Sequence, residues 1–352
     1  MKLTISKILE EVKDKKVIVI GDIIEDVSIF GKTIRACEEG VSNIFDITSI
    51  QTSLGGAGLV AETLSVLLSK VILIGAVDFG NRQVKSTFLN GDNLKKERFD
   101  GFSDILSAFK GKNIGLIPIL KNNWYNQKIR FYSEDGKLIF RTDMAGDVNK
   151  NTLSTDDGTT RELEDDILYQ RFLHEIDPIN KEVFFVILSD YNKGVLNKRS
   201  ITDIINYCKV HDIPVYVDTK KEDISYFSGA KAVKINNKRF NDGIVVKKLS
   251  TNLIVTRGNK EIYLYDMTKN NVINIAEERP YTIPINQEPN FKDAIGAGDI
   301  FTAYLSIFDS YFGGKSFNDL TTAIKFSSTV ASLSTRFQGT HIFEKKVLIN
   351  LI

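Results

Sequence analysis

The sequence predicts an α/β protein: a doubly wound, mostly parallel sheet flanked by helices, with a small lid of additional β-strands. Three features of the chain support this prediction. Short apolar runs rich in β-branched residues recur along it, helical segments lie between them, and two segments instead alternate polar and apolar residues. A run that is apolar at every position is typical of a strand covered on both faces, whereas alternation is typical of a strand with one exposed face.

Seven apolar runs are the expected strands of the main sheet. They are KVIVIGD (16–22), VILIGAV (71–77), IGLIPI (114–119), VFFVILSD (183–190), IPVYVDT (213–219), AVKIN (232–236) and NLIVTRG (252–258). The expected helices are GAGLVAETLSVLLS, NKRSITDIINYCKVH, GAGDIFTAYLSIF and DLTTAIKFSSTVASLS. This alternation of strand and helix predicts parallel strands connected by crossover helices.

The two alternating segments, at about 23–52 and 121–144, predict antiparallel lid strands that leave the main sheet. The second contains KIRFYSEDGKLIFRTD, which predicts a hairpin turning at 134–136. Residues 145–165 are polar, so we expect a solvated loop that leads into a helix. The whole chain, 1–352, is treated as a single domain.

The composition argues against several classes of protein. With 352 residues, 42% of them hydrophobic, and a formal net charge of +1, the chain gives no electrostatic reason to expect nucleic acid or an anionic membrane as partner. No run reaches the roughly 18 apolar residues that a membrane helix needs, and the N-terminus does not read as a signal peptide. Cys37 and Cys208 are too far apart to suggest a disulfide scaffold or a zinc site. We therefore expect a cytoplasmic protein.

The stretch NFKDAIGAGDIFTAYLSIF carries the strongest chemical signal. Gly296, Ala297 and Gly298 lack bulky side chains, so a ligand can approach the backbone closely. The first amides of the helix expected after them point outward with positive partial charge, which suits a phosphate group. Asp299, in the first turn, can take a proton from an attacking hydroxyl, and Asp293 could orient the loop or a metal-bound water.

This turn has two alternative interpretations. A glycine-rich turn with an aspartate at the helix start is also a common capping arrangement without any catalytic role. A dinucleotide-binding fold would place its glycine fingerprint after the first strand, where this chain instead reads GDIIED (21–26). The second observation makes a dehydrogenase a poor fit.

Several ordered motifs resemble the ribokinase-like (PfkB) carbohydrate kinases, from about residue 15 to 342. DAIGAGD matches the family signature D-x-x-G-A-G-D, SLGGAGLVAETL resembles G-G-A-x-N-x-A, VIVIGDIIEDVSIFG resembles the first strand with its sugar-contacting aspartate, and LIVTRG resembles the nucleotide-side strand. VILSDYNKGVLN, IPVYVDTKKEDISYFSGAKAVKINN and RACEEGVSNIFDI are similar to one branch, the heptose-7-phosphate kinases of lipopolysaccharide precursor synthesis.

The resemblance implies transfer of the γ-phosphoryl group of ATP, with Mg²⁺ carried by the nucleotide, to a sugar or sugar-phosphate hydroxyl. Asp299 would be the base, and Gly296, Ala297 and Gly298 would form the anion hole. The residues implied on the substrate side are Asp26, Arg35, Gly55, Gly56, Lys193 and Lys220. Those implied on the nucleotide side are Asn236, Thr256, Gly258, Asp293 and Gly339. The cations among them are candidates for holding an existing sugar phosphate, although each could equally be an ordinary surface cation.

The chain departs from the family pattern at several positions. Leu59 stands where the family has an asparagine that contacts the sugar, and Arg239 replaces the acid of the N-x-x-E motif. Three functions therefore stay open: a heptose-7-phosphate kinase, a kinase for another sugar or sugar phosphate, and a non-catalytic binding protein on the same fold. We expect a homodimer formed through the lid, with Trp124 and Tyr125 covering the sugar or packing between lids. The nucleotidyltransferase that some heptose kinases carry fused is expected to be a separate protein here.

Overall fold

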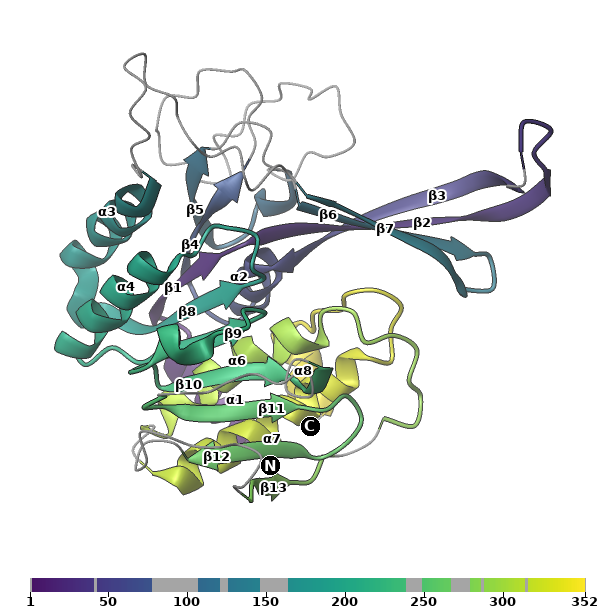
Figure 1. Ribbon diagram of the computed structural model, residues 1–352. Coiled ribbons are helices and arrows are strands. Elements are labelled where there is room, and N and C mark those ends of the chain that lie inside the picture. The colour runs from purple at the N-terminus through teal and green to yellow at the C-terminus, as the bar shows by residue number, and fades with distance from the viewer. Residues whose placement is uncertain are drawn as a thin grey trace, which may run out of the picture.

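The large sheet of the protein has nine strands, and a second sheet has four. The computed structural model describes residues 2–40, 43–77, 107–120, 126–145, 164–238, 249–266, 279–285, 288–313 and 316–351. Helices cover the large sheet, whereas the four-stranded sheet extends from it as a long twisted arm (Figure 1). This architecture confirms the predicted fold class.

The order of strands across the large sheet follows the doubly wound pattern. It runs β13 (Tyr281–Ile283), β12 (Ile262–Asp266), β11 (Asn252–Thr256), β10 (Ala232–Asn236), β9 (Val215–Thr219), β8 (Val183–Asp190), β1 (Lys16–Gly21), β4 (Lys70–Val77) and β5 (Ile114–Leu120). All strands from β11 to β5 pair in parallel, and all seven predicted strands are present. The sequence analysis missed β12 and β13, which add antiparallel to the edge at β11.

Helices bury both faces of this sheet. The α-helices are α1 (Lys2–Val12), α2 (Ala57–Ser65), α3 (Glu164–Ile176), α4 (Lys198–Val210), α6 (Ala297–Tyr311), α7 (Phe317–Ser334) and α8 (Lys345–Leu351), and the 3₁₀ turns are η1 (Ser107–Phe109), η3 (Asp177–Glu182) and η4 (Ile224–Phe227). One apolar core contains residues of α1, α2, α6, α7 and α8, and a second contains residues of α3 and α4. None of the helices in the described part of the chain is long and apolar enough to cross a membrane.

The difference between α4 and α6 follows from their sequences. In α4 the buried apolar residues recur every three or four positions, at Ile201, Ile204, Ile205 and Cys208, which leaves the other side of the helix polar. A capping box between Asn197 and Ser200 begins this helix. In α6 every residue from 299 to 309 is buried, so its polar residues must find partners inside the protein.

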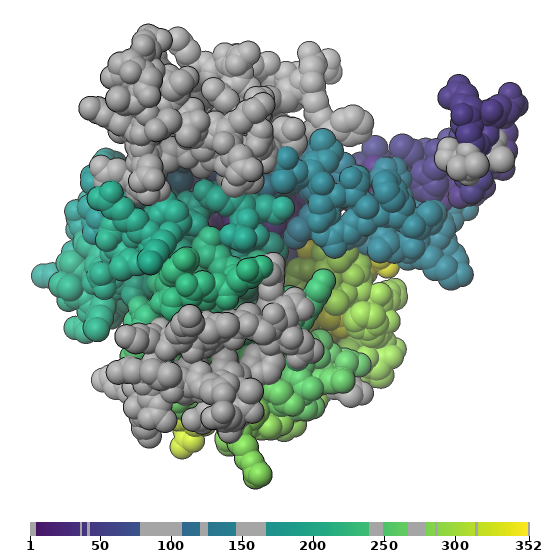
Figure 2. All heavy atoms as spheres, in the orientation of Figure 1, coloured from purple at the N-terminus to yellow at the C-terminus, as the bar shows by residue number. Residues whose placement is uncertain are grey.

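The four-stranded sheet is the predicted lid, with one correction. Its order is β3 (Asn43–Gly56), β2 (Ile23–Ala36), β6 (Asn126–Ser133) and β7 (Leu138–Ala145). The predicted hairpin joins β6 to β7, with Gly136 in the left-handed region at φ 80°. The central pair, β2 and β6, is parallel rather than antiparallel, because these strands come from two separate hairpins that leave the main sheet in the same direction. Figure 2 shows the arm projecting beyond the rest of the surface.

The junction between β1 and the lid is tightly packed. A Cβ at Gly21 would lie 1.9 Å from the carbonyl oxygen of Ser189, so no larger residue fits there. The next residue, Asp22, donates its N–H to that same carbonyl at 3.0 Å. Its own carbonyl accepts the N–H of Ala57, the first residue of α2, at 3.0 Å. The first strands of both sheets and the start of α2 therefore meet at one peptide.

The carboxylate of Asp22 organises the loop that follows β8. It is fully buried and accepts the backbone N–H groups of Tyr191, Lys193 and Val195, at 2.8, 3.0 and 3.2 Å. Burial, together with the nearby Asp190, raises the pKa of Asp22 to about 6, and the three amides act in the opposite direction. One carboxylate thus fixes the conformation of a loop in which Asn192 adopts a positive φ of 57°.

Replacing Asp22 by alanine is expected to lower the free energy of unfolding by at least about 2 kcal/mol, because three buried amides lose their acceptor. Urea denaturation at pH 7.5 measures this loss. Asp14→Ala, which removes an exposed carboxylate just before β1, is the control and should change the free energy of unfolding by less than about 0.5 kcal/mol. Equal stabilities of the Asp22 variant and the wild type would contradict this role.

Candidate active site

The predicted glycine turn, Gly296 to Gly298, forms the start of α6. Gly296 is the N-cap of α6 with φ 75°, and no side chain from the described residues caps this terminus. A Cβ at Gly296 would lie 2.5 Å from Leu59 and 2.8 Å from Thr340. The turn therefore requires glycine both for its left-handed backbone and for its packing. The N–H of Ala297 donates to the Ala294 carbonyl at 3.3 Å. This amide of the predicted anion hole is therefore already engaged, and the N–H of Gly298 is the next one along the helix.

Asp299 is a buried carboxylate in the first turn of α6, as predicted. Its residue is 3% exposed, and Tyr191 Oη lies 2.8 and 3.0 Å from its two carboxylate oxygens. Burial raises the pKa of Asp299 to about 6, and the charge of Asp218 adds to this rise. Lys234, the Tyr191 hydroxyl and Lys220 act in the opposite direction. A carboxyl group with this pKa is ionised at pH 7 and still basic enough to accept a proton.

A buried ion pair lies behind this first turn. Lys234, on β10, donates to the Asp218 carboxylate of β9 at 2.5 Å and to the Gly298 carbonyl at 3.1 Å. Lys220 approaches the other oxygen of Asp218 at 3.4 Å. Burial alone would raise the pKa of Asp218, but the two lysines outweigh burial and leave it lowered.

The lid contributes a second buried ion pair on the substrate side. Arg130, on β6, donates to Asp26, on β2, at 2.6 Å, and both side chains are less than 10% exposed. A Cβ at Gly55 would lie 2.3 Å from Asp26 Oδ2, so this glycine lets the carboxylate lie against β3. Gly56, at φ 57°, lies close to the Asp22 carbonyl, and a Cβ built on it would be 2.5 Å from that carbonyl oxygen. The predicted residues Asp26, Gly55 and Gly56 therefore share one corner at the base of the lid.

Cations from both sheets converge on Tyr191. The ammonium group of Lys128, on lid strand β6, lies 4.5 Å from the centre of the Tyr191 ring, and that of Lys220 lies 5.0 Å from it. Burial lowers the pKa of Lys128, while Asp26 and Asp299 act in the opposite direction. Lys193 acts electrostatically on Asp143 of the lid strand β7. Positive charges from the lid and from the main sheet therefore lie around the tyrosine whose hydroxyl contacts Asp299.

Two of the residues predicted on the nucleotide side lie at the carboxyl ends of adjacent strands. Asn236 and Thr256 are paired in register at the last positions of β10 and β11, and Gly258 follows at φ 65°. Asp293 accepts the backbone N–H groups of Ile295 at 3.0 Å and Gly339 at 3.1 Å. Asp293 therefore orients the glycine turn, one of the two roles that the sequence suggested, and connects it to the later turn at Gly339.

Arg35 does not join the other predicted substrate residues. It lies near the far end of β2, exposed, and its nearest described ionic partner is Glu38 at 3.2 Å. The reason is the length of β2 and β3, 14 residues each, which carries this end of the arm away from α6 (Figure 1). Leu59 is fully buried and packs beneath Gly296, so it adds no polar group to the site. Arg239, Trp124 and Tyr125 lie outside the described residues.

Sequence reasoning missed several residues of the site. Lys234 is the single charged residue of the apolar run AVKIN, and that isolation in a buried strand was a usable signal. Lys128 and Arg130 are two residues apart on a strand, so they lie on one face of the lid, as the alternation already implied. Tyr191 had no comparable signal, because its role depends on the loop conformation that Asp22 fixes.

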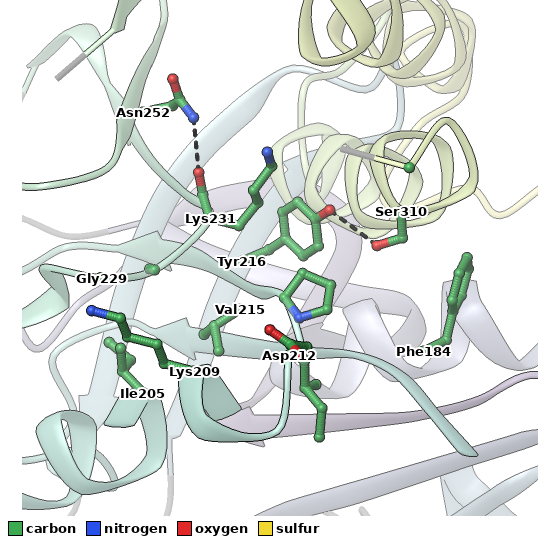
Figure 3. A pocket seen from close by; sticks show the side chains of 14 residues that line it. Phe184, Ile205, Lys209, Asp212, Val215, Tyr216, Gly229, Lys231, Asn252 and Ser310 are labelled. Atoms are coloured by element: carbon green, nitrogen blue, oxygen red, sulfur yellow. Dashed lines mark hydrogen bonds between the residues drawn. The ribbon is translucent and has the colours of Figure 1, made fainter. Parts of the chain in front are cut away.

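A cavity of about 520 Å³ lies at the amino ends of β8 to β11, opposite the strand ends that carry the candidate site, and none of the predicted site residues lines it (Figure 3). Its wall includes Tyr216, whose hydroxyl donates to buried Asp309 at 2.7 Å and lies 3.0 Å from Ser310 Oγ. Its two lysines have structural roles: Lys209 ends the last turn of α4, and Lys231 acts on the Asp309 carboxylate. We therefore assign it no part in the chemistry at Asp299.

Comparison with known proteins places this geometry in context. No family model matches the chain. Among curated proteins, "Bifunctional protein HldE" of Bradyrhizobium sp. (strain ORS 278) is 25% identical over 335 residues, covering 92% of this chain and 60% of that protein. "Bifunctional protein HldE" of Helicobacter pylori (strain G27) is 30% identical over 225 residues, covering 63% of this chain and 41% of that protein. The chain thus spans less than two thirds of the length of either relative.

A solved structure shows the same fold. Arabidopsis thaliana ribokinase, complexed with ribose and ATP, superposes with a TM-score of 0.60 at 14% identity, covering 96% of this chain and 98% of that one. The predicted ribokinase-like fold is confirmed, and the curated matches agree with the resemblance seen in the sequence.

Replacing Asp299 by asparagine is expected to stabilise the protein above neutral pH. The folded-state pKa of about 6 exceeds the ordinary value of 3.8, so the wild type loses stability as pH rises between these values, and the variant does not. The variant should be more stable at pH 8 by on the order of 1–3 kcal/mol. Urea denaturation at pH 5 and pH 8 measures this. Asp203→Asn, on the partly exposed side of α4, is the control. A variant less stable than the wild type at pH 8 would contradict the burial argument.

Proposed function

We propose that this chain, which has the ribokinase-like fold of carbohydrate kinases, transfers the γ-phosphoryl group of ATP to a hydroxyl of a sugar or sugar phosphate. One observation carries the proposal. The carboxylate of Asp299 is buried in the first turn of α6, held by the Tyr191 hydroxyl, beside a helix terminus that no described side chain caps. A general base and an anion-binding terminus are the two parts that phosphoryl transfer to an alcohol requires.

In the proposed reaction, Asp299 accepts the proton of the acceptor hydroxyl as that oxygen bonds to the γ-phosphorus of ATP. The bond between this phosphorus and the bridging oxygen of ADP breaks, and ADP leaves. The Tyr191 hydroxyl donates to the carboxylate and fixes its orientation. The N–H groups of Gly298 and Asp299, at the start of α6, stabilise the negative charge on the phosphoryl oxygens, because the first amides of a helix have no intrahelical partner. Gly298 has no side chain, so a phosphate can approach this backbone.

ATP is the proposed donor, with its phosphates at the Gly296 turn and its remaining part toward Asn236, Thr256 and Gly258. The ATP in the related ribokinase supports this choice. The described carboxylates near the turn do not fit a protein-bound Mg²⁺, since Asp218 is occupied by two lysines and Asp299 by Tyr191. We therefore propose that Mg²⁺ enters with the nucleotide, whose phosphates it would screen, and we assign it no residue of this chain.

The cations around Tyr191 favour an acceptor that already carries a phosphate. Lys128 and Lys220 approach one ring from the lid and the main sheet, and Lys193 lies toward the same part of the lid. Lys220 already pairs with Asp218, so the phosphate is proposed chiefly for Lys128, whose largely buried ammonium group a phosphate would neutralise. Heptose 7-phosphate is the most specific acceptor that we propose, on the strength of the sequence motifs and of the HldE name that the relatives carry.

A second copy of this chain is the proposed protein partner. Seven large apolar side chains of the lid are 42–59% exposed, and they come from β2, β3 and β7: Ile34, Ile47, Ile50, Leu138, Ile139, Phe140 and Met144. Phe131 connects Phe45 and Phe140 into an aromatic row across three lid strands, with ring centres 5.7 and 5.1 Å apart. An apolar surface of this kind is characteristic of a protein interface.

Turnover tests the function directly. We expect ADP release when the protein receives ATP, Mg²⁺ and a panel of sugars and sugar phosphates, with heptose 7-phosphate among the best acceptors. Asp299→Asn should reduce kcat by at least about 100-fold, since removal of a general base costs 10²–10⁴-fold. Lys128→Met should raise KM for phosphorylated acceptors about tenfold or more and leave the KM for ATP unchanged. Lys209→Met, in the last turn of α4 and beside the cavity at the amino ends of the strands, is the matched control.

Two results would contradict the proposal. Tight binding of a sugar phosphate by calorimetry, without ADP release for any acceptor, identifies a binding protein on this fold. A KM of Lys128→Met for phosphorylated acceptors equal to that of the wild type would instead reject only the phosphate site.

The dimer is tested by light scattering after size-exclusion chromatography. The wild type should have twice the mass of one chain, and Phe140→Glu should shift the equilibrium toward the monomer because it places a charge in the proposed apolar interface. Val210→Glu changes an apolar residue that is 78% exposed at the end of α4, and should leave the dimer intact. A monomeric wild type would refute the lid interface.

A further inference from the structure

Lys234 is an unusual residue for its position. It lies in β10 between β9 and β11 and is only 2% exposed. Its pairing register places it directly beside Asp218 of β9. From there its ammonium group reaches Asp218 Oδ2 at 2.5 Å and the Gly298 carbonyl at 3.1 Å. A Cβ built on Gly298 would lie 3.1 Å from the same nitrogen, so the ammonium group packs against the first turn of α6.

This placement is electrostatically unfavourable in two respects. The start of a helix carries positive partial charge, which repels a cation, and burial removes the hydration of the ammonium group. Burial indeed lowers the pKa of Lys234, while Asp218 acts in the opposite direction. An apolar residue would satisfy a buried β-strand without either cost, so packing alone does not account for a lysine here.

Asp218 is the group that gives this lysine a role. Thr302, one turn after Asp299, donates to the Gly298 carbonyl at 3.0 Å and lies 3.5 Å from Asp218 Oδ2. The Asp218 carboxylate is therefore buried against the same turn that presents the base, and its charge opposes ionisation of Asp299. Two uncompensated carboxylates in one buried site share a proton, and such a pair makes a poor base at neutral pH.

We infer that Lys234 is a positioning residue for the proposed reaction: its ammonium group neutralises Asp218 and braces the first turn of α6, so that Asp299 acts as a lone carboxylate. The inference rests on the proposed function, because it concerns the base of that reaction. Lys220 also neutralises Asp218, but Lys234 is the lysine that contacts the first turn of α6, at the Gly298 carbonyl. Lys220 lies farther from Asp218, at 3.4 Å, its side chain is 21% exposed, and it also faces the Tyr191 ring.

The pH dependence of the reaction reports on this arrangement. The charged and titratable groups that face Asp299 come from several different elements; they are Lys128, Tyr191, Asp218, Lys220 and Lys234. Since Asp299 must be ionised to accept a proton, kcat is high above its pKa and falls as pH decreases through it. Any change that raises this pKa moves the acid limb of the profile to higher pH.

The test compares kcat–pH profiles, from pH 5 to 9, of the wild type and variants at the ion pair. Lys234→Met leaves Asp218 neutralised only in part, by Lys220, so the acid limb should move up by about one pH unit, or about tenfold in kcat at a pH on that limb. Asp218→Asn removes the opposing carboxylate, so the limb should move to lower pH. The double variant, Asp218→Asn with Lys234→Met, should lie between the two. Lys231→Met, beside Asp309 at the other end of α6, is the matched control and should leave the profile unchanged.

Opposite shifts in the two single variants support the inference, because a merely structural ion pair would be damaged in the same way by either change. Identical profiles, or shifts in the same direction, overturn it. If Lys234→Met does not fold, Asp218→Asn and the double variant still decide between these outcomes. A wild type without turnover on any acceptor overturns the proposed function itself, whereas an active wild type with unshifted variants overturns only the role of Lys234.

Discussion

The site depends on one constraint, the burial of an ionisable carboxylate in the first turn of α6. Asp299 is almost fully enclosed, and burial disfavours its charged form. Three surrounding groups, the Tyr191 hydroxyl and the ammonium groups of Lys220 and Lys234, act against that cost. They come from the loop after β8, the segment after β9, and β10. The parallel order of these strands brings their carboxyl ends together, which places all three groups beside one helix terminus.

The sequence predicted the fold well because its signals were local. Strands buried on both faces are apolar throughout, so each of the seven strands from β1 to β11 in the main sheet could be recognised from its own residues. The strands β12 and β13 were missed because IYLYD and YTI are short and partly polar, and β13 forms the edge of the sheet. The parallel pairing of β2 with β6 was missed because it joins residues about 100 positions apart, and alternation within one strand carries no information about its neighbour.

Only part of the site was predicted, and that part is again specified by a local pattern in the sequence. Asp299 and the glycine turn form one continuous motif, and the backbone of Gly296 requires what that motif provides. Lys234 and Tyr191 contribute through contacts 64 and 108 residues apart in the chain, which no local pattern specifies. Arg35 shows the converse error. A motif identified its residue type, but its position was set by the length of the arm that carries it.

The lid and the base are connected by a short chain of contacts. β2 begins directly after Asp22, whose carboxylate holds the N–H of Tyr191, and the hydroxyl of Tyr191 donates to Asp299. Lys128, on the neighbouring lid strand, lies over the same tyrosine ring. An acceptor bound beneath the lid, as proposed, would therefore contact groups that also orient the proposed base. Both ends of this chain of contacts are buried carboxylates, Asp22 and Asp299, with raised pKa values. Burial therefore makes the ionised form of each carboxylate costly in free energy. That cost is consistent with selection for function rather than for stability alone.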